Sequence, residues 1–222
     1  MDKKIIALIP ARGGSKGIPK KNIKIFKGSP LIVHSINYAL SCELINETYV
    51  TTDDMEIAKI ATDAGAKVID RPKNLSLDES STESAIQHAL DELTNKPDII
   101  ILLQPTSPIR PPNSLKKGLK IYSNGKYDSL LSISPTHNFF WNINNDIAEP
   151  NYNFMNRPRR QDMKDEDISY IENGSLYIFS YEHFIKTKNR LGGKIGYIIF
   201  PEEFSLEIDT MLDFTVLENY EK

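Results

Sequence analysis

A glycine-rich, basic segment near the start of the sequence most constrains the fold. The apolar run Ile5–Ile9 leads into Pro10-Ala11-Arg12-Gly13-Gly14-Ser15-Lys16-Gly17, and Lys20, Lys21 and Asn22 follow. Glycines let backbone N–H groups approach a polyphosphate closely, and four cations fall within this one segment. Its spacing matches neither the P-loop nor the dinucleotide-binding signature. The segment predicts a phosphate-binding loop at a strand end or, alternatively, an exposed basic turn.

Composition limits the class of ligand. The 222 residues are 40% hydrophobic, which suffices for one sizeable core, so we expect a single domain over residues 1–222. The formal net charge of −3 argues against nucleic acid as a partner, and the local basic loop points to a small anionic ligand. No apolar run approaches the ~20 residues of a membrane span and no signal-peptide pattern precedes Pro10. We therefore expect a cytoplasmic protein with no membrane partner.

Alternating segments predict an α/β fold. Strand-like runs at residues 5–9, 47–51, 66–70, 98–103 and 129–134 alternate with amphipathic, helix-like runs. Open sheets of this class bind ligands beyond the carboxyl ends of their strands, which is where the glycine-rich segment lies. We expect Asp53 or Asp54 to cap the second helix, and Ser80 with Glu83 to form a capping box for the third.

A second polar segment follows the most hydrophobic strand-like run, residues 98–103. Its sequence is Gln104-Pro105-Thr106-Ser107-Pro108-Ile109-Arg110. Two prolines prevent simple continuation of the strand, so the polar side chains are expected in a defined loop at another carboxyl end. The competing interpretation is a plain proline-rich connection.

The regular alternation of strand-like and helix-like runs stops between residues 135 and 169. This stretch contains Phe139-Phe140-Trp141 and the basic segment Asn156–Asp162. An aromatic cluster in a long excursion often packs against another subunit, so we expect a dimerisation arm at about residues 136–170. One of Arg157, Arg159 and Arg160 would then reach a ligand carboxylate or phosphate. The alternative is an exposed basic loop.

A carboxylate pair precedes the last helix. In an extended segment Glu207 and Asp209 lie on one face, about 7 Å apart, while Ile208 points into the core. Mg²⁺ takes oxygen ligands, usually one or two carboxylates plus substrate phosphates, so the pair suggests metal-assisted chemistry on a nucleotide. The alternative makes Asp209 or Thr210 the N-cap of that helix.

These segments resemble the motifs of a known family, the cytidylyltransferases that activate nonulosonic acids, best represented by the CMP-sialic acid (N-acylneuraminate) synthetases. The resemblance covers nearly the entire chain. Its first motif, with Gly13–Gly17 and Lys21-Asn22, is absent in this form from the related Kdo-activating enzymes. The other matching segments are Leu103–Pro108, Arg159–Asp162, Asn173-Gly174 with Tyr177, and Ile208–Thr210.

The resemblance implies a Rossmann-like, three-layer αβα nucleotidyltransferase core with a mixed, mostly parallel sheet and a small dimerisation insertion. It implies transfer of CMP from CTP to the anomeric hydroxyl of a nonulosonic acid, either sialic acid or a bacterial analogue such as legionaminic acid. Pyrophosphate would be released, Mg²⁺ would be the cofactor, and the protein would be a homodimer.

The resemblance also implies site residues. Those expected to bind the nucleotide are Arg12, Gly14, Ser15, Lys16, Lys21, Asn22, Arg71, Ser81 and Thr82. Those expected to bind the sugar are Gln104, Arg160 and Tyr177, and those expected to bind the metal are Glu207 and Asp209. The catalytic residues would be Arg12, Lys21 and Asp209. No side chain is identified as the general base.

Two departures from the family pattern concern the acceptor. Members commonly show Asp where this chain has Glu207, and Glu172 stands where sialic acid enzymes have a basic Arg-Pro before Asn-Gly. The sugar acid therefore stays open. Alternative functions are a related nucleotidyltransferase for another sugar acid such as Kdo, and a non-catalytic nucleotide sensor of the same fold.

Overall fold

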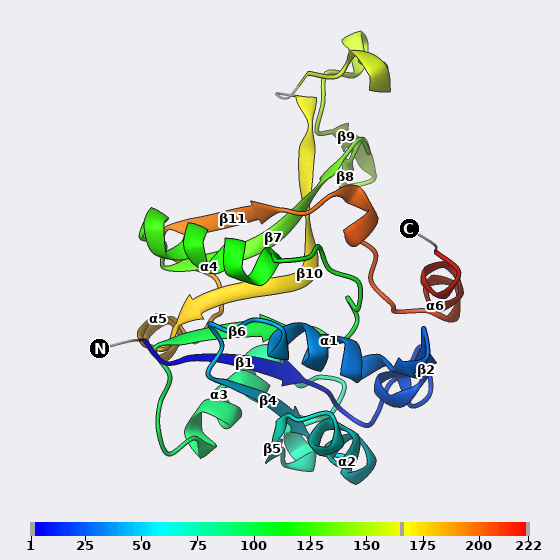
Figure 1. Ribbon diagram of the computed structural model, residues 1–222. Helices are drawn as coiled ribbons and strands as arrows, with labels where there is room; N and C mark the ends of the chain where they lie inside the picture. Colours follow the sequence, from blue (N-terminus) through cyan, green and yellow to red (C-terminus); the bar gives the residue numbers. More distant parts are fainter. Residues whose placement is uncertain (1–2, 165–166, 221–222) are drawn as a thin grey trace.

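The computed structural model describes residues 3–164 and 167–220 and is built on a mixed β-sheet (Figure 1). The strands of this sheet are β1 (Ile5–Pro10), β4 (Glu47–Thr52), β5 (Lys67–Asp70), β6 (Ile99–Leu103), β7 (Ser129–Thr136), β10 (Ser169–Ser180) and β11 (Ile195–Ile199). Their order is β11-β7-β10-β6-β1-β4-β5. Only β10 runs antiparallel to its neighbours. The predicted mixed, mostly parallel sheet is confirmed.

Helices cover both faces of the sheet (Figure 1). They are α1 (Leu31–Leu40), α2 (Met55–Asp63), α3 (Thr82–Glu92), α4 (Ser114–Gly125), α5 (Tyr181–Thr187) and α6 (Met211–Glu218). Side chains alternate along β1: Ala7 and Ile9 pack with α1, α2 and α4, while Ile6 and Leu8 pack with α3 and α5. The three-layer αβα prediction is therefore confirmed. Within the described ranges, every helix is too short or too polar to span a bilayer.

A third, smaller core joins two distant parts of the chain. The hairpin of β2 (Ile25–Phe26) and β3 (Ser29–Pro30) follows the first loop and packs beside α6. The buried side chains of this core are Ile18, Phe26, Leu31, Ile208, Phe214 and Leu217. Burial of these apolar groups fixes the glycine-rich loop against the segment before α6, beyond the carboxyl end of β1 (Figure 1).

An excursion separates β7 from β10, close to the bounds predicted for the arm at residues 136–170. It contains the antiparallel hairpin of β8 (Trp141–Asn144) and β9 (Ile147–Pro150), followed by the short turns η3 (Phe154–Asn156) and η4 (Arg160–Asp162). Figure 1 shows this segment projecting away from the sheet. Asp165 and Glu166 of the predicted arm lie outside the described residues. A role in dimerisation stays a prediction.

One predicted helix cap was wrong by a single residue. Ser81, not Ser80, caps α3, because the Ser81 hydroxyl accepts a hydrogen bond from the Ser84 N–H at 3.1 Å. The Ser80 hydroxyl is engaged in the preceding turn, where it accepts from the Leu77 N–H at 3.1 Å. The expected cap of α2 is Asp54, whose carboxylate accepts from the N–H groups of Glu56 and Ile57.

Candidate active site

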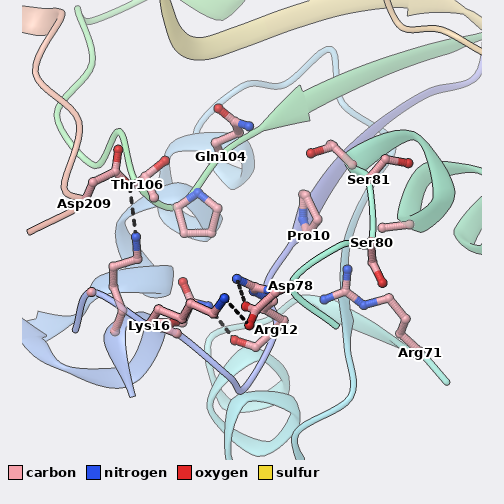
Figure 2. A pocket seen from close by; sticks show the side chains of 17 residues that line it. Pro10, Arg12, Lys16, Arg71, Asp78, Ser80, Ser81, Gln104, Thr106 and Asp209 are labelled. Carbon is pink, nitrogen blue, oxygen red and sulfur yellow. Dashed lines mark hydrogen bonds and ion pairs between the residues drawn. The ribbon is translucent and has the colours of Figure 1, made fainter. Parts of the chain in front are cut away.

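A polar cleft opens beyond the carboxyl ends of β1 and β6, with a volume of about 410 Å³ (Figure 2). Its walls come from the loops after β1, β5 and β6 and from the segment before α6. This volume is typical of small-molecule sites. The predicted residues that line it are Arg12, Ser15, Lys16, Lys21, Asn22, Arg71, Ser81, Thr82, Gln104 and Asp209. Gly14, Arg160, Tyr177 and Glu207 are not among the lining residues.

The glycine-rich loop, residues 11–22, is held in place by polar contacts of its backbone. The buried Asn22 side chain donates to the Arg12 carbonyl at 2.9 Å, and the Gly13 N–H donates to the Asp53 carboxylate at 3.0 Å. Gly17 is required for a close approach, since a Cβ there would lie 2.2 Å from the Asp209 carbonyl oxygen. A Cβ at Gly14 would meet nothing within 4 Å.

Carboxylates already contact the cations of this loop (Figure 2). Asp78 lies 2.9 Å from Arg12 Nη2 and 2.8 Å from Lys16 Nζ, and Lys21 Nζ lies 3.2 Å from Asp209 Oδ1. Lys20 pairs with Glu56 outside the cleft lining. Asp78 was not predicted, because one acidic residue in an exposed polar loop carries no distinguishing pattern.

Arg71 extends from the end of β5 into the cleft, beside Ser80 (Figure 2). The residue is only 8% exposed, and its Nε and Nη2 groups have no hydrogen-bond partner in the described part of the chain. Burial lowers the pKa of the guanidinium, while the charge of Asp53 partly offsets the shift. Buried donors without acceptors cost free energy. The position of Arg71 therefore favours a ligand that supplies a hydrogen-bond acceptor.

The loop after β6 is defined by a second buried arginine. Arg110 donates to the carbonyls of Gln104 at 2.7 Å and Ser175 at 3.3 Å, and to the Ser35 hydroxyl at 3.0 Å. Burial lowers the pKa of Arg110 to about 10. These bonds tie the loop to α1 and β10, so the polar segment after residue 103 is a fixed wall of the cleft, as predicted.

The segment before α6 buries Ile208, as predicted, between the two carboxylates Glu207 and Asp209. Ile208 is fully buried, and its N–H donates to the Thr106 carbonyl at 2.8 Å. Glu207 is half-buried beside Thr106, and burial, followed by the charge of Asp209, raises the pKa of Glu207 to about 7. Thr210 forms the capping box of α6 with Asp213, which leaves the Asp209 side chain free of that role.

These two carboxylates fit a hard cation. Glu207 lacks enough nearby positive charge to keep its pKa at the ordinary value, and both residues offer only oxygen donors. Over residues 3–164 and 167–220, no three acidic, histidine or cysteine side chains gather as a potential metal site. The pair therefore fits an ion such as Mg²⁺ that takes its remaining ligands from substrate phosphates and water.

The other two predicted sugar-binding residues, Tyr177 and Arg160, are not among the residues that line this cleft. Tyr177 is buried in β10, where its hydroxyl donates to Glu172 and the Arg190 guanidinium carbon lies 4.6 Å from the ring centroid. Burial, followed by the Glu172 hydrogen bond, raises the pKa of Tyr177. The three arginines of the excursion make other contacts: Arg160 with Glu202 at 3.3 Å, Arg159 with Asp162 at 2.5 Å, and Arg157 over the Phe139 ring.

Solved structures of other proteins share this fold. CMP:2-keto-3-deoxy-manno-octonic acid synthetase complexed with CTP superposes with a TM-score of 0.71 at 17% identity, covering 97% of each chain. The 4-diphosphocytidyl-2C-methyl-D-erythritol synthase of Anaerococcus prevotii superposes with a TM-score of 0.69 at 14% identity, covering 99% of each chain. At these identities the likeness shows the fold alone.

Sequence comparison identifies the family. N-acylneuraminate cytidylyltransferase A of Danio rerio is 40% identical over 219 residues, and the N-acylneuraminate cytidylyltransferase of Escherichia coli O18:K1:H7 is 33% identical over 220 residues. Each match covers 96% of this chain but 50% and 51% of the respective relative, so the chain spans about half the length of the curated relatives it matches. The family model described as cytidylyltransferase matches residues 6–222, and the chain belongs to the cytidylyltransferase family.

Proposed function

We propose that this protein transfers CMP from CTP to the anomeric hydroxyl of a nonulosonic acid, with release of pyrophosphate. One observation supports this most strongly: the basic glycine-rich loop, the Gln104 loop and Asp209 line one cleft with the buried Arg71, whose Nε and Nη2 have no hydrogen-bond partner among the described residues. Arg71 and the glycine-rich loop would bind a nucleoside triphosphate. The Gln104 loop and Asp209 would bind an acceptor and a metal ion. The relatives named N-acylneuraminate cytidylyltransferase support the acceptor class.

The cleft offers separate surfaces for the base and the phosphates. The Nε and Nη2 donors of Arg71, which have no partner in the described part of the chain, suit the carbonyl and ring-nitrogen acceptors of cytosine, and Ser81 and Thr82 line the same cleft. Arg12 and Lys16 line the same cleft, where they would neutralise the triphosphate, and Ser15 would donate a hydrogen bond to it. Gly14 has an open position in the loop and would contribute its backbone N–H.

The reaction we propose is an in-line displacement. A bond forms between the anomeric oxygen of the acceptor and the α-phosphorus of CTP, the bond to the β-phosphate oxygen breaks, and the hydroxyl proton is released. Such chemistry depends on positioning and on charge neutralisation rather than on a covalent intermediate. Arg12 and Lys21 would offset the negative charge of the leaving pyrophosphate.

The cofactor we propose is Mg²⁺, held by Glu207 and Asp209. The raised pKa of Glu207 supports this assignment, because a divalent cation would stabilise the ionised form that burial disfavours. When bound, the ion supplies Lewis-acid stabilisation of phosphoryl charge. Lys21, which contacts Asp209, would share the same phosphate.

The acceptor side would be completed by a second copy of the chain. Gln104 is the predicted sugar-binding residue that lines the cleft, whereas Arg157, Arg159 and Arg160 all lie on the excursion. We therefore propose a homodimer in which one of these arginines meets the acceptor carboxylate in the partner's cleft. The exposed apolar side chains of the β8–β9 hairpin, Trp141 and Ile143, support an interface there.

The test is pyrophosphate release from CTP and Mg²⁺ with a panel of 2-keto sugar acids, including sialic, legionaminic and Kdo acids, and with ATP, GTP and UTP as control nucleotides. Release that requires both CTP and a nine-carbon acid is the expected result. Release with Kdo alone would identify the related nucleotidyltransferase instead. CTP binding without release for any acceptor would identify a nucleotide sensor.

A further inference from the structure

The Asp78 carboxylate forms ion pairs with two cations of the glycine-rich loop. Asp78 lies 2.9 Å from Arg12 Nη2 and 2.8 Å from Lys16 Nζ, and all three residues line the cleft (Figure 2). The other guanidinium nitrogen, Arg12 Nη1, donates to the Leu77 carbonyl at 2.8 Å. Both ends of the Arg12 fork therefore face the loop after β5 rather than open cleft.

We propose that Asp78 is a built-in competitor for the phosphate-binding cations, which a polyphosphate must displace and which returns to Arg12 and Lys16 when that polyphosphate leaves. A phosphate oxygen bound at Arg12 Nη2 and Lys16 Nζ would lie beside the Asp78 carboxylate, so the two anions compete for the same positive charges. The inference rests on the proposed phosphate role of the loop.

The contacts of Asp78 are of the kind that exchange readily. The Asp78 side chain is 42% exposed and that of Lys16 is 79% exposed, and exposed ion pairs contribute little to stability. The two cations, Lys16 first, still hold the pKa of Asp78 below its usual range, so it is charged at neutral pH. A triphosphate carries several negative charges, whereas Asp78 carries one. The triphosphate can therefore displace this carboxylate at a modest cost in free energy.

Displacement of Asp78 would also move residues that face the nucleoside. Asp78 lies two residues before Ser80, whose hydroxyl bonds the Leu77 N–H, and three before Ser81, which caps α3. Ser80 and Ser81 both line the cleft near Arg71. The same short loop therefore links the phosphate side to the base side.

This arrangement lowers the affinity of the loop for every polyphosphate by one common factor. CTP recovers affinity through Arg71 and the base side, whereas free pyrophosphate has only the loop cations. Under the proposed function, pyrophosphate is the product, so Asp78 would favour its release. A residue that merely oriented Arg12 would have the opposite effect, because its loss would weaken phosphate binding.

Calorimetric titration of inorganic pyrophosphate and of CTP into the wild type and Asp78→Asn tests the proposal. Replacing the carboxylate by an amide keeps the shape of the side chain and should tighten both ligands about tenfold. The matched control is Glu79→Gln, which removes an adjacent exposed charge outside the cleft lining and should change neither affinity by more than about twofold.

Unchanged or weaker pyrophosphate binding in Asp78→Asn would overturn the proposal, as would a wild type and variant that both fail to bind pyrophosphate. Asp78→Ala, with thermal melting of both variants, separates an effect on binding from a folding defect. The titration needs neither an acceptor nor turnover, so tighter binding would support this inference even if no sugar acid releases pyrophosphate.

Discussion

Lys21 Nζ lies 3.2 Å from Asp209 Oδ1 across 188 residues of sequence, and it also donates to the Ile208 carbonyl at 2.9 Å. The small core of Ile18, Phe26 and Ile208 beneath this contact keeps the glycine-rich loop and the carboxylate segment together. The contact therefore joins the two halves of the proposed site, the phosphate side and the metal side.

Lys21→Ala and Asp209→Ala should each lower turnover at least ~100-fold, because each removes a preorganised charge at the reacting phosphate. Steady-state pyrophosphate release with saturating CTP measures the loss. Lys20→Ala is the matched control: its ammonium pairs with Glu56 outside the cleft, and its removal should leave turnover within about twofold. Near-normal turnover in a folded Asp209→Ala variant would remove the metal assignment.

Gly17→Ala should destabilise the fold by about 1–3 kcal/mol, because the new Cβ overlaps a backbone oxygen that cannot rotate away. The clash is with the Asp209 carbonyl at 2.2 Å, so the Lys21 contact should shift and turnover should fall as well. Chemical denaturation measures the stability.

The control for that substitution is Gly14→Ala, in the same loop. Its Cβ would meet nothing within 4 Å, and the backbone N–H is retained, so stability should change by less than about 0.5 kcal/mol. Equal destabilisation by the two alanines would show that close approach at Gly17 is not what requires glycine.

Glu207→Gln should stabilise the metal-free protein increasingly as the pH rises. Burial and the charge of Asp209 raise the folded-state pKa of Glu207 from 4.5 to about 7. Its stabilising contribution is complete below pH 4.5 and is lost as the pH rises through about 7, where the folded protein must ionise it. An uncharged glutamine avoids that loss, so the variant should gain about 1–3 kcal/mol over the wild type by pH 8.

Denaturant titrations at pH 5, 6.5 and 8, with and without Mg²⁺, measure this difference. Mg²⁺ should stabilise the wild type at pH 8 and have little effect on the variant, because the glutamine oxygen carries no charge. A stability difference that does not change with pH would show that Glu207 is not perturbed in solution.

The alternation of strands and helices could be predicted because it depends on local periodicity, and the site followed from loops at strand ends. Contacts between distant segments could not be derived in that way. Asp78 is a plain loop acid until the fold brings it to Arg12 and Lys16. Tyr177 lies in an ordinary strand pattern, and it is buried because β10 lies inside the sheet between β7 and β6.

Ile143→Glu should convert the proposed dimer to a monomer. The β8–β9 register places Ile143 opposite Ala148 and Trp141 opposite Pro150 on one apolar face of the hairpin, and Ile143 is 68% exposed. A charge buried in an interface is strongly unfavourable. Sedimentation equilibrium measures the association, and Asn142→Lys, a new charge on the opposite face, is the control. A wild type that is monomeric at micromolar concentration would remove the arm hypothesis.

Two buried arginines should respond oppositely to replacement by methionine. Arg110 satisfies the carbonyls of Gln104 and Ser175, so Arg110→Met leaves buried acceptors unpaired and should cost about 3 kcal/mol of stability. Among the described residues Arg71 has no hydrogen-bond partner for Nε and Nη2, and Asp53 only partly compensates its buried charge, so Arg71→Met should leave stability unchanged or higher.

CTP binding should show the opposite ranking of the two substitutions from that seen in stability. Arg71→Met should weaken CTP at least tenfold, because the donors proposed for cytosine are lost, while inorganic pyrophosphate, which lacks a base, should bind as before. Denaturant titration and calorimetry on the same preparations give both quantities. If Arg71→Met destabilised the free protein as much as Arg110→Met, or weakened CTP and pyrophosphate equally, Arg71 would be a structural residue rather than the base-recognition group.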